Sequence, residues 1–397
     1  MTGLKATPFH PRTAALSQGQ EWRRWAGYVA ASAYELLPDR EYAAIRHTAA
    51  LFDVTPLYKY RVEGQDAAKL LDRVVPRDVG RAALGQVLYT PWCDSRGRVL
   101  DDGTIQRLGE RSFRMTSALP GLTWLELNAT GLDVTLRGET EATAALALQG
   151  PAARRILQEV VDADLAELRF FHLVATRLAG VPAEISRTGY TGDLGYEIWI
   201  DREHALTVWD RLIDAGTPYG ITPAGLLALD VARIEAGLLL LDVDYVSARH
   251  ALIDAQTSTP YELGLGWAVR LDKGPFVGRE ALREARRRGA ATRFVAIDVV
   301  WDSLEALYAE LGLPPQLPRT AWRGSVPLYA GGEQVGYATS GCWSPILKQY
   351  VALAHVQASH ADPGCPVEME ITVEHRPRRA QARVVDKPVF DPERKRA

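Results

Sequence analysis

The sequence predicts an α+β protein that ends in an all-β domain. Between Glu41 and about Pro275, short alternating segments are mixed with segments whose apolar residues recur at helical spacing. From about Phe294 onward, strand-like runs separated by turn residues dominate. A length of 397 residues with 47% hydrophobic residues is enough for two or three domains with real cores. We therefore expect an α+β region at 1–275, a connecting helix at 276–293 and a β-domain at 294–397.

Two strand–turn–helix units are visible in the α+β region. In the first, LYKYRVEG alternates as a strand and runs into QDAAKLLDRVV, where Leu70, Leu71 and Val74 recur at helical spacing. In the second, ALALQG is followed by PAARRILQEVV, and Pro151 lies where the first turn of a helix accepts proline. The same order of elements occurs twice, so we expect two similar α+β modules.

The C-terminal segments FVAIDVV, EQVGYATSG, YVALAHV and VEMEITVEH all have the composition of strands. In the last of them Val367, Met369 and Ile371 share one face, and the residues between them are polar. This pattern predicts a C-terminal barrel or sandwich. The preceding segment GREALREARRRG predicts a charged helix whose arginines form a solvated face rather than a binding patch.

Composition and charge exclude several classes of protein. A net charge of -3 and a pI near 6.3 argue against a nucleic-acid-binding protein, because such proteins usually have a basic surface. The three cysteines form no CxxC pair, so neither a disulfide framework nor a zinc site is expected, and a reducing cytoplasm fits best. The most apolar stretch, AGLLALDVARIEAGLLLLDVDY, carries charged residues that include Asp230, Arg233, Glu235 and Asp242, and it is not expected to cross a membrane. No histidine lies at metal-ligand spacing with another, so no metal site is expected.

The stretch CDSRGRVLDDGTIQRL places two acids, Asp101 and Asp102, between strand-like runs. Asp-Gly between alternating apolar residues is the usual signal of a short hairpin, so a structural turn is the simpler interpretation. A turn needs only one acid, however, and Asp101 could project from the strand end into a cleft. A paired acid in that place could hold or move a proton.

The stretch RTGYTGDLGYEIWI begins as a glycine-rich loop and ends as an alternating strand. It lacks the Lys-Ser/Thr pair of a phosphate loop and does not open a helix. Glu197 is either a surface glutamate on a half-buried strand or a carboxylate that faces a flat heterocycle. A carboxylate pairs well with two parallel N–H donors, and Tyr190 could supply an aromatic wall or a hydroxyl.

The stretch ALDVARIEAGLLLL predicts a buried helix that carries Arg233 and Glu235. Unpaired buried charges are costly, so both need partners, and an internal salt-bridge network is the simplest source of them.

Taken together, these segments resemble the aminomethyltransferase family, which comprises the T-protein of the glycine cleavage system and its tetrahydrofolate-dependent relatives. The similarity covers nearly the whole chain and is carried by motifs in the family's order. They are FDVTPLYKYRVEG, DSRGRVLDDGTI, LQGPAA, RTGYTGDLGYEI, RIEAGLLL, LGLGWAVRLDKGPFVGREAL, GYATSGCWSPIL and DKPVFDPERKR.

The resemblance implies a three-domain ring of two α+β modules and a C-terminal β-barrel, with tetrahydrofolate at its centre. Asp101 matches the family's catalytic aspartate, beside the folate N5 and N10 atoms. Glu197 resembles the glutamate that grips the pterin edge. Further folate contacts are implied at Tyr89, Asp102, Tyr190 and Arg233 and, in the C-terminal domain, at Arg379.

Departures from the glycine-cleavage pattern concern the donor of the one-carbon unit. Where those enzymes usually have an arginine and a Tyr-Gly pair around the arginine helix, this chain has Leu229, Leu241 and Asp242. A loop glycine before the acids is replaced by Arg98. These changes disfavour a lipoyl arm as substrate and leave the folate contacts intact. The ending DKPVFDPERKR is closer to the folate domains of dimethylglycine- and sarcosine-oxidising enzymes and to stand-alone demethylases.

The sequence therefore favours a cytoplasmic tetrahydrofolate-dependent one-carbon transferase that demethylates a small N-, O- or S-methylated compound. Trp92 and Trp343 could line an apolar donor pocket, although tryptophans are more often plain core or domain-interface residues. One alternative is aminomethyl transfer from a lipoyl carrier protein. A second is a non-catalytic folate-binding protein.

Overall fold

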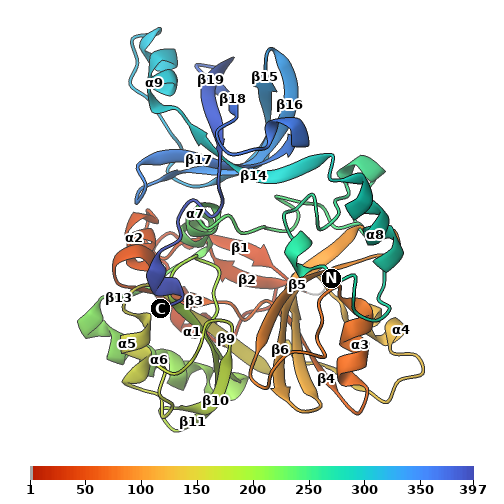
Figure 1. The fold of residues 1–397 in the computed structure, drawn as a ribbon. Coiled ribbons are helices and arrows are strands. Elements are labelled where there is room, and N and C mark those ends of the chain that lie inside the picture. Colours follow the sequence, from red (N-terminus) through yellow and green to blue (C-terminus); the bar gives the residue numbers. More distant parts are fainter. Residues whose placement is uncertain (1–2) are drawn as a thin grey trace.

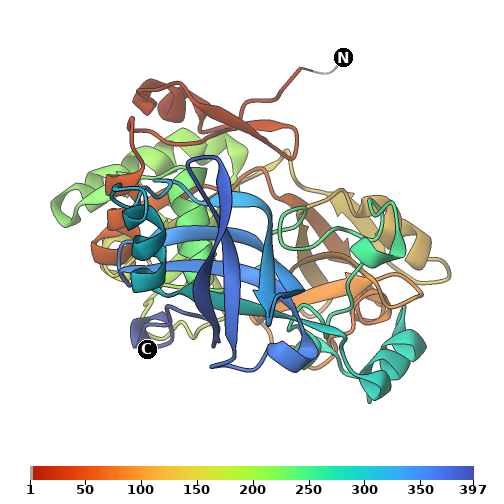
Figure 2. The same cartoon turned by 90° about the horizontal axis from the view of Figure 1, so that it is seen from above.

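A computed structural model describes residues 3–397 and divides them into two α+β modules with a β-barrel set across them (Figure 1). Seen from above, the barrel strands run over the junction of the two modules (Figure 2). This is the three-domain ring that the resemblance implied. Within residues 3–397, no helix combines the length and the apolar character that crossing a membrane requires.

The first module is a five-stranded sheet in the order β5-β6-β7-β4-β8. Helix α3 (Ala67–Val74) packs on it through Leu70 and Leu71, which are fully buried, because its apolar residues recur at helical spacing. A second helix, α4 (Leu122–Asn128), completes this layer. The strands are β4 (Tyr58–Glu63), β5 (Val87–Cys93), β6 (Val99–Gly109), β7 (Ser112–Ser117) and β8 (Thr135–Gly138).

The second module is a six-stranded sheet in the order β10-β11-β12-β9-β3-β13, covered on both faces. In β9, Leu146 and Leu148 face helices α5 and α6, while Ala145 and Ala147 face α2 and α7. Strand β3 precedes the whole first sheet in the chain, so the two modules are intertwined. The elements are α2 (Asp39–His47), β3 (Ala49–Asp53), β9 (Thr143–Gln149), α5 (Ala153–Gln158), β10 (Leu173–Leu178), β11 (Val181–Ser186), β12 (Gly195–Asp201), α6 (Ala205–Gly216), β13 (Ile221–Pro223) and α7 (Leu226–Glu235).

The C-terminal domain is a closed barrel in the order β14-β17-β16-β15-β18-β19. The predicted alternation holds in β18, where Val367, Met369 and Val373 are buried. Helix α9 was not predicted; its Leu304 and Tyr308, four residues apart, pack on the barrel. The elements are α8 (Arg279–Arg288), β14 (Thr292–Val299), α9 (Trp301–Ala309), β15 (Trp322–Ala330), β16 (Glu333–Ser344), β17 (Gln349–Gln357), β18 (Pro366–Val373) and β19 (Arg376–Val385).

The N-terminal segment adds a helix, α1 (His10–Leu16), and a hairpin of β1 (Trp22–Trp25) and β2 (Tyr28–Ala31). All three parts of the molecule contribute to one central hydrophobic cluster. Cys93 comes from the first module, Trp199 from the second and Phe294 from the barrel. The three parts of the molecule therefore share one hydrophobic core.

Candidate functional site

The acid pair lies inside a strand and not at a turn. Asp101 and Asp102 belong to β6, and the chain reverses earlier, at Asp94–Gly97, where Gly97 has a φ of 74°. The predicted Asp-Gly hairpin turn is therefore wrong. Gly103 is required for another reason: a Cβ atom there would lie 2.1 Å from the carbonyl oxygen of Thr116 in β7.

Asp102 is the partly exposed member of the pair and is held by two tyrosines. Tyr89, in β5, donates its hydroxyl to Oδ2 at 2.7 Å. Tyr245, in the loop after α7, donates its hydroxyl to Oδ1. Both carboxylate oxygens are thus occupied by hydroxyl donors from two different parts of the fold.

Asp101 is only 3% exposed and lies behind Asp102. Its Oδ1 accepts the backbone N–H of Asp102 and its Oδ2 accepts that of Leu119, both at 2.8 Å. Burial, and next the neighbouring charge of Asp102, raise the pKa of Asp101 to about 8. Burial also raises the pKa of Asp102, but the two tyrosine hydrogen bonds act in the opposite direction. The accessible carboxyl group is consequently Asp102, whereas the resemblance pointed to Asp101.

Arg233 lies in a network of buried charges with Asp230 and Asp244. The side chain is fully buried in α7; its Nε donates to Asp230 at 2.8 Å, and its Nη1 donates to Asp244. Its Nη2 is buried without a hydrogen-bond partner among residues 3–397. The expected internal salt-bridge network exists, and it leaves one guanidinium N–H₂ group available to a ligand.

Tyr190 connects this network to the glycine-rich loop. Its hydroxyl donates to the carbonyl oxygen of Leu239, just after α7. Burial raises the pKa of Tyr190, and the charges of Arg233, Asp244 and Asp102 all act on it, so these groups are close together. Tyr190 is also close enough to Tyr89 to contribute to the raised pKa of the Tyr89 hydroxyl.

Glu197, in β12, is not on a solvated face. One of its oxygens, Oε2, accepts the hydroxyl of Thr188 at 2.6 Å, and burial raises the pKa of the carboxyl group. The adjacent loop glycines make room for Gln149, because a Cβ at Gly189 or Gly195 would lie within 2.2 Å of its side-chain oxygen. The loop is thus fixed by packing, with a desolvated carboxyl group at its edge.

Three predicted residues make no hydrogen bond or ion pair with this network among residues 3–397, although Trp92 lies opposite Asp101 in the β5–β6 ladder. Arg379 in β19 stacks on Tyr329 of the barrel, 3.6 Å from the ring centre, and makes a long ion pair with Glu368. Arg379 is therefore engaged within the barrel, and its contact with folate stays a prediction. Trp92 is buried in the core of the first module, and Trp343 packs against Trp301 of the barrel. These placements do not support a donor pocket lined by both tryptophans.

Three residues of the network were not singled out from the sequence: Tyr245, Asp244 and Lys387. Lys387 lies in the tail after the barrel, with its Nζ 4.4 Å from the ring centre of Phe294. Burial lowers the pKa of Lys387 to about 8, while the charge of Asp244 acts to raise it. The motif DKPVFDPERKR was the available signal for this residue, and it was used for the resemblance alone.

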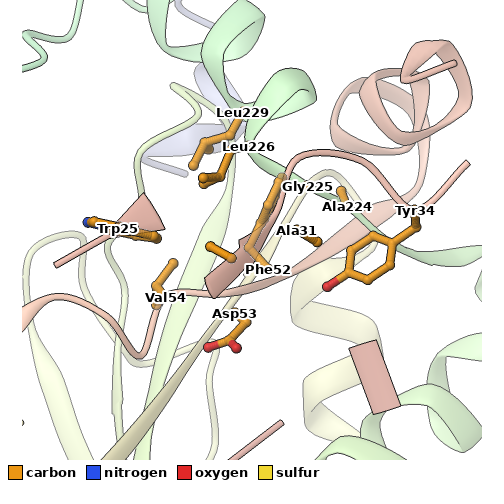
Figure 3. Close-up of a pocket in the computed structure, with 11 residues that line it drawn as sticks. Trp25, Ala31, Tyr34, Phe52, Asp53, Val54, Ala224, Gly225, Leu226 and Leu229 are labelled. Carbon is orange, nitrogen blue, oxygen red and sulfur yellow. The ribbon is translucent and has the colours of Figure 1, made fainter. Parts of the chain in front are cut away.

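A small apolar pocket lies between the N-terminal hairpin, β3 and the start of α7 (Figure 3). Trp25 and Leu229 close it, and Asp53 lies at its border. Its volume of about 10 Å³ is enough for roughly one water molecule. The remaining lining residues are Ala30, Ala31, Tyr34, Phe52, Val54, Ala224, Gly225 and Leu226.

Two family models match the chain. Residues 9–273 match the GCVT N-terminal domain, and residues 311–391 match the glycine cleavage T-protein C-terminal barrel domain. The second match covers β15 to β19 of the barrel and the start of the tail after it, and the first covers both α+β modules.

Curated relatives and one solved structure are similar over almost the full length. An aminomethyltransferase of Moorella thermoacetica is 34% identical over 394 residues, which is 98% of this chain and 99% of that protein. One of Caldanaerobacter subterraneus is 32% identical over 352 residues, covering 87% and 86% of the two chains. The crystal structure of glycine cleavage system aminomethyltransferase T from Bartonella henselae superposes with a TM-score of 0.82 at 25% identity, over 98% of this chain and 99% of that one.

Proposed function

Because the chain belongs to the glycine cleavage T-protein family, we propose that it is an aminomethyltransferase that transfers a one-carbon unit to tetrahydrofolate. The chain is a transferase by family, so the non-catalytic alternative is set aside. The single observation that carries the proposal for the site is the convergence of Asp102, Tyr89, Tyr190 and Arg233 in one desolvated network.

The residues present fit a folate. The buried Nη2 of Arg233 has no hydrogen-bond partner within residues 3–397, and a ligand acceptor would satisfy it. Glu197 offers a desolvated carboxyl group, the chemistry that recognises a planar edge with parallel N–H donors. Tetrahydrofolate would supply the nitrogen that accepts the one-carbon unit. Arg233, Glu197 and Tyr190 would hold it against the acid pair.

Asp102 is the residue we assign to the chemistry. It is the accessible carboxylate, and its two tyrosine partners fix both its oxygens. A fixed carboxylate can stabilise positive charge that develops on a nitrogen or accept its proton. Asp101, enclosed behind it, supports the orientation of the strand and does not meet the reacting atoms.

Aminomethyl transfer implies a donor on a carrier protein. The relatives that match along the whole chain are aminomethyltransferases, and this favours an aminomethyl-lipoyl carrier over the free methylated compound that the sequence motifs favoured. The carrier is therefore the partner we propose.

Demethylation of a free compound remains a second candidate because of one observation. Leu229 stands where glycine-cleavage enzymes usually carry arginine, and its side chain lines the apolar pocket with Trp25 (Figure 3). This pocket has space for about one water molecule, so a donor would need the pocket to widen.

The test begins with calorimetric titration of the protein with tetrahydrofolate. Folate mass is then measured after incubation with an aminomethyl-lipoyl carrier protein or with methylated amines, methoxyaromatics and sulfonium compounds. A one-carbon gain from the carrier alone supports the proposal. A gain from a free compound moves the assignment to demethylation, and absence of folate binding overturns both.

A further inference from the structure

Tyr245 reaches the acid pair from a tightly built turn. It is 3% exposed, and its carbonyl oxygen accepts the backbone N–H of Asp242 at 2.8 Å. The neighbouring Asp244 accepts the hydroxyls of Thr339 and Ser340 of the barrel, at 2.5 and 2.9 Å, and also holds Arg233. The barrel and α7 therefore fix the turn that presents Tyr245 to β6.

Asp101 and Asp102 are neighbouring carboxyl groups without a compensating cation. Among residues 3–397, no lysine or arginine forms an ion pair or hydrogen bond with either group. Ionising both of two adjacent, largely buried carboxyl groups is unfavourable in free energy, because repulsion between like charges and desolvation both disfavour the second charge. At neutral pH the pair therefore favours holding one proton.

Hydrogen bonds decide which member carries that proton. Asp102 accepts two hydroxyl donors, and such bonds to an ionised carboxylate are stronger than bonds between neutral groups. Asp101 accepts two backbone N–H groups but is more deeply enclosed. The other titratable groups facing the pair are Tyr60, Tyr190 and Asp244, and none of them is a cation.

We propose that Tyr245 is a positioning residue that, together with Tyr89, keeps Asp102 ionised and leaves the single proton of the pair on Asp101. This inference deepens the proposed function of the same site, since it identifies Asp102 as the carboxylate ready to act. The protonation of the pair is a property of the protein alone. It can be measured without folate or donor, so its failure is distinguishable from failure of the proposed function.

Infrared difference titration of the ligand-free protein tests the inference directly. In the wild type, a protonated carboxyl band should persist at pH 7. Asp101→Asn should remove this band, and Asp102→Asn should retain it. The inference is overturned if Asp102→Asn is the variant that removes the band.

Tyr245→Phe tests the role of the hydroxyl. Loss of one hydrogen bond to the charged form should raise the pKa of Asp102, so its ionisation should move to higher pH by about one unit or more. The acid limb of kcat/KM against pH should move the same way. Tyr219→Phe is the matched control, because among residues 3–397 the Tyr219 hydroxyl donates only to exposed Glu159, at 3.1 Å. An unshifted Asp102 titration in folded Tyr245→Phe contradicts the proposal.

Tyr89→Phe provides a second route if Tyr245→Phe does not fold. It removes the other hydroxyl bond to Asp102, and the same upward movement of the pKa is expected. If the pKa of Asp102 in Tyr89→Phe equals that of the wild type, the proposal that two tyrosine hydroxyls keep Asp102 ionised is contradicted.

Discussion

The hydroxyl of Ser344 in the barrel donates to Oε1 of Glu235 in α7 at 2.6 Å. The other oxygen of this fully buried carboxylate accepts from Arg46 of α2, whose Nε lies at 3.0 Å. Tyr42 also donates to Oε1. Glu235 therefore joins the barrel to the second module.

Removal of Glu235 should destabilise the whole molecule. Glu235→Ala leaves the guanidinium of Arg46 buried with one carboxylate partner fewer, and breaking a buried pair in this way costs about 3–5 kcal/mol. Urea denaturation measures the change. Glu280→Ala, on exposed α8, is the control and should change the free energy of unfolding by less than about 0.5 kcal/mol. A similar small effect at Glu235 would contradict its structural role.

Replacement by asparagine should lower kcat far more at Asp102 than at Asp101. Asp102→Asn removes the accessible charge and should lower kcat by about 10²- to 10⁴-fold with a smaller effect on tetrahydrofolate affinity. Asp101→Asn replaces a protonated carboxyl group by a neutral amide and should retain most of the activity. Single-turnover assays of both purified variants measure this. An equally large loss in stable Asp101→Asn would restore the catalytic role that the resemblance gave to Asp101.

Glu197→Gln should weaken tetrahydrofolate binding. The amide replaces an acceptor by a donor at the desolvated carboxyl group, and a hydrogen bond to a charged group is worth about 1.5–3 kcal/mol. Calorimetry measures the affinity, and Glu203→Gln, in the exposed turn that follows β12, is the control. If the affinity of Glu197→Gln equals that of the wild type, Glu197 does not contact the folate.

The sequence predicted those features that depend on the local order of apolar residues or on the cost of burying a single charge. Alternation predicted β18, and the cost of buried charge predicted partners for Arg233 and Glu235. The Asp-Gly signal failed because Gly103 is required by the close approach of β7 and not by a turn. Tyr245 was missed because its contact with Asp102 spans 143 positions of the chain, and no local pattern reports such a contact.

Lys59 should make stability depend on pH. It is fully buried, its Nζ donates to the carbonyl oxygens of Thr55 and Leu57, and burial lowers its pKa to about 7. Above about pH 7 the folded protein releases this proton, whereas the unfolded chain keeps it up to about pH 10.4. Between these two pH values the unfolded state binds more protons than the folded state. The free energy of unfolding therefore increases with pH in this range because of Lys59.

Chemical denaturation of wild type and Lys59→Met at pH 6.5 and pH 9 measures this dependence. The wild type should gain stability relative to the variant as pH increases. Lys69→Met, an exposed position on α3, should show no such difference. Parallel pH dependence in wild type and Lys59→Met would mean that the lysine keeps its proton throughout.

Asp242 occupies a backbone conformation that favours glycine. Its φ is 61°, and it begins the turn that carries Asp244 and Tyr245 to the site. The departure from the family's Tyr-Gly pair therefore preserves the turn, because aspartate tolerates the left-handed region better than most residues.

Asp242→Gly should leave the free energy of unfolding and the folate affinity close to wild type. Asp242→Val should cost about 1–2 kcal/mol, because a branched side chain is strained at this φ. The same variant should raise the pKa of Asp102 in the infrared titration if the displaced turn withdraws the Tyr245 hydroxyl. A stable Asp242→Val protein with wild-type titration would show that the turn does not control the acid pair.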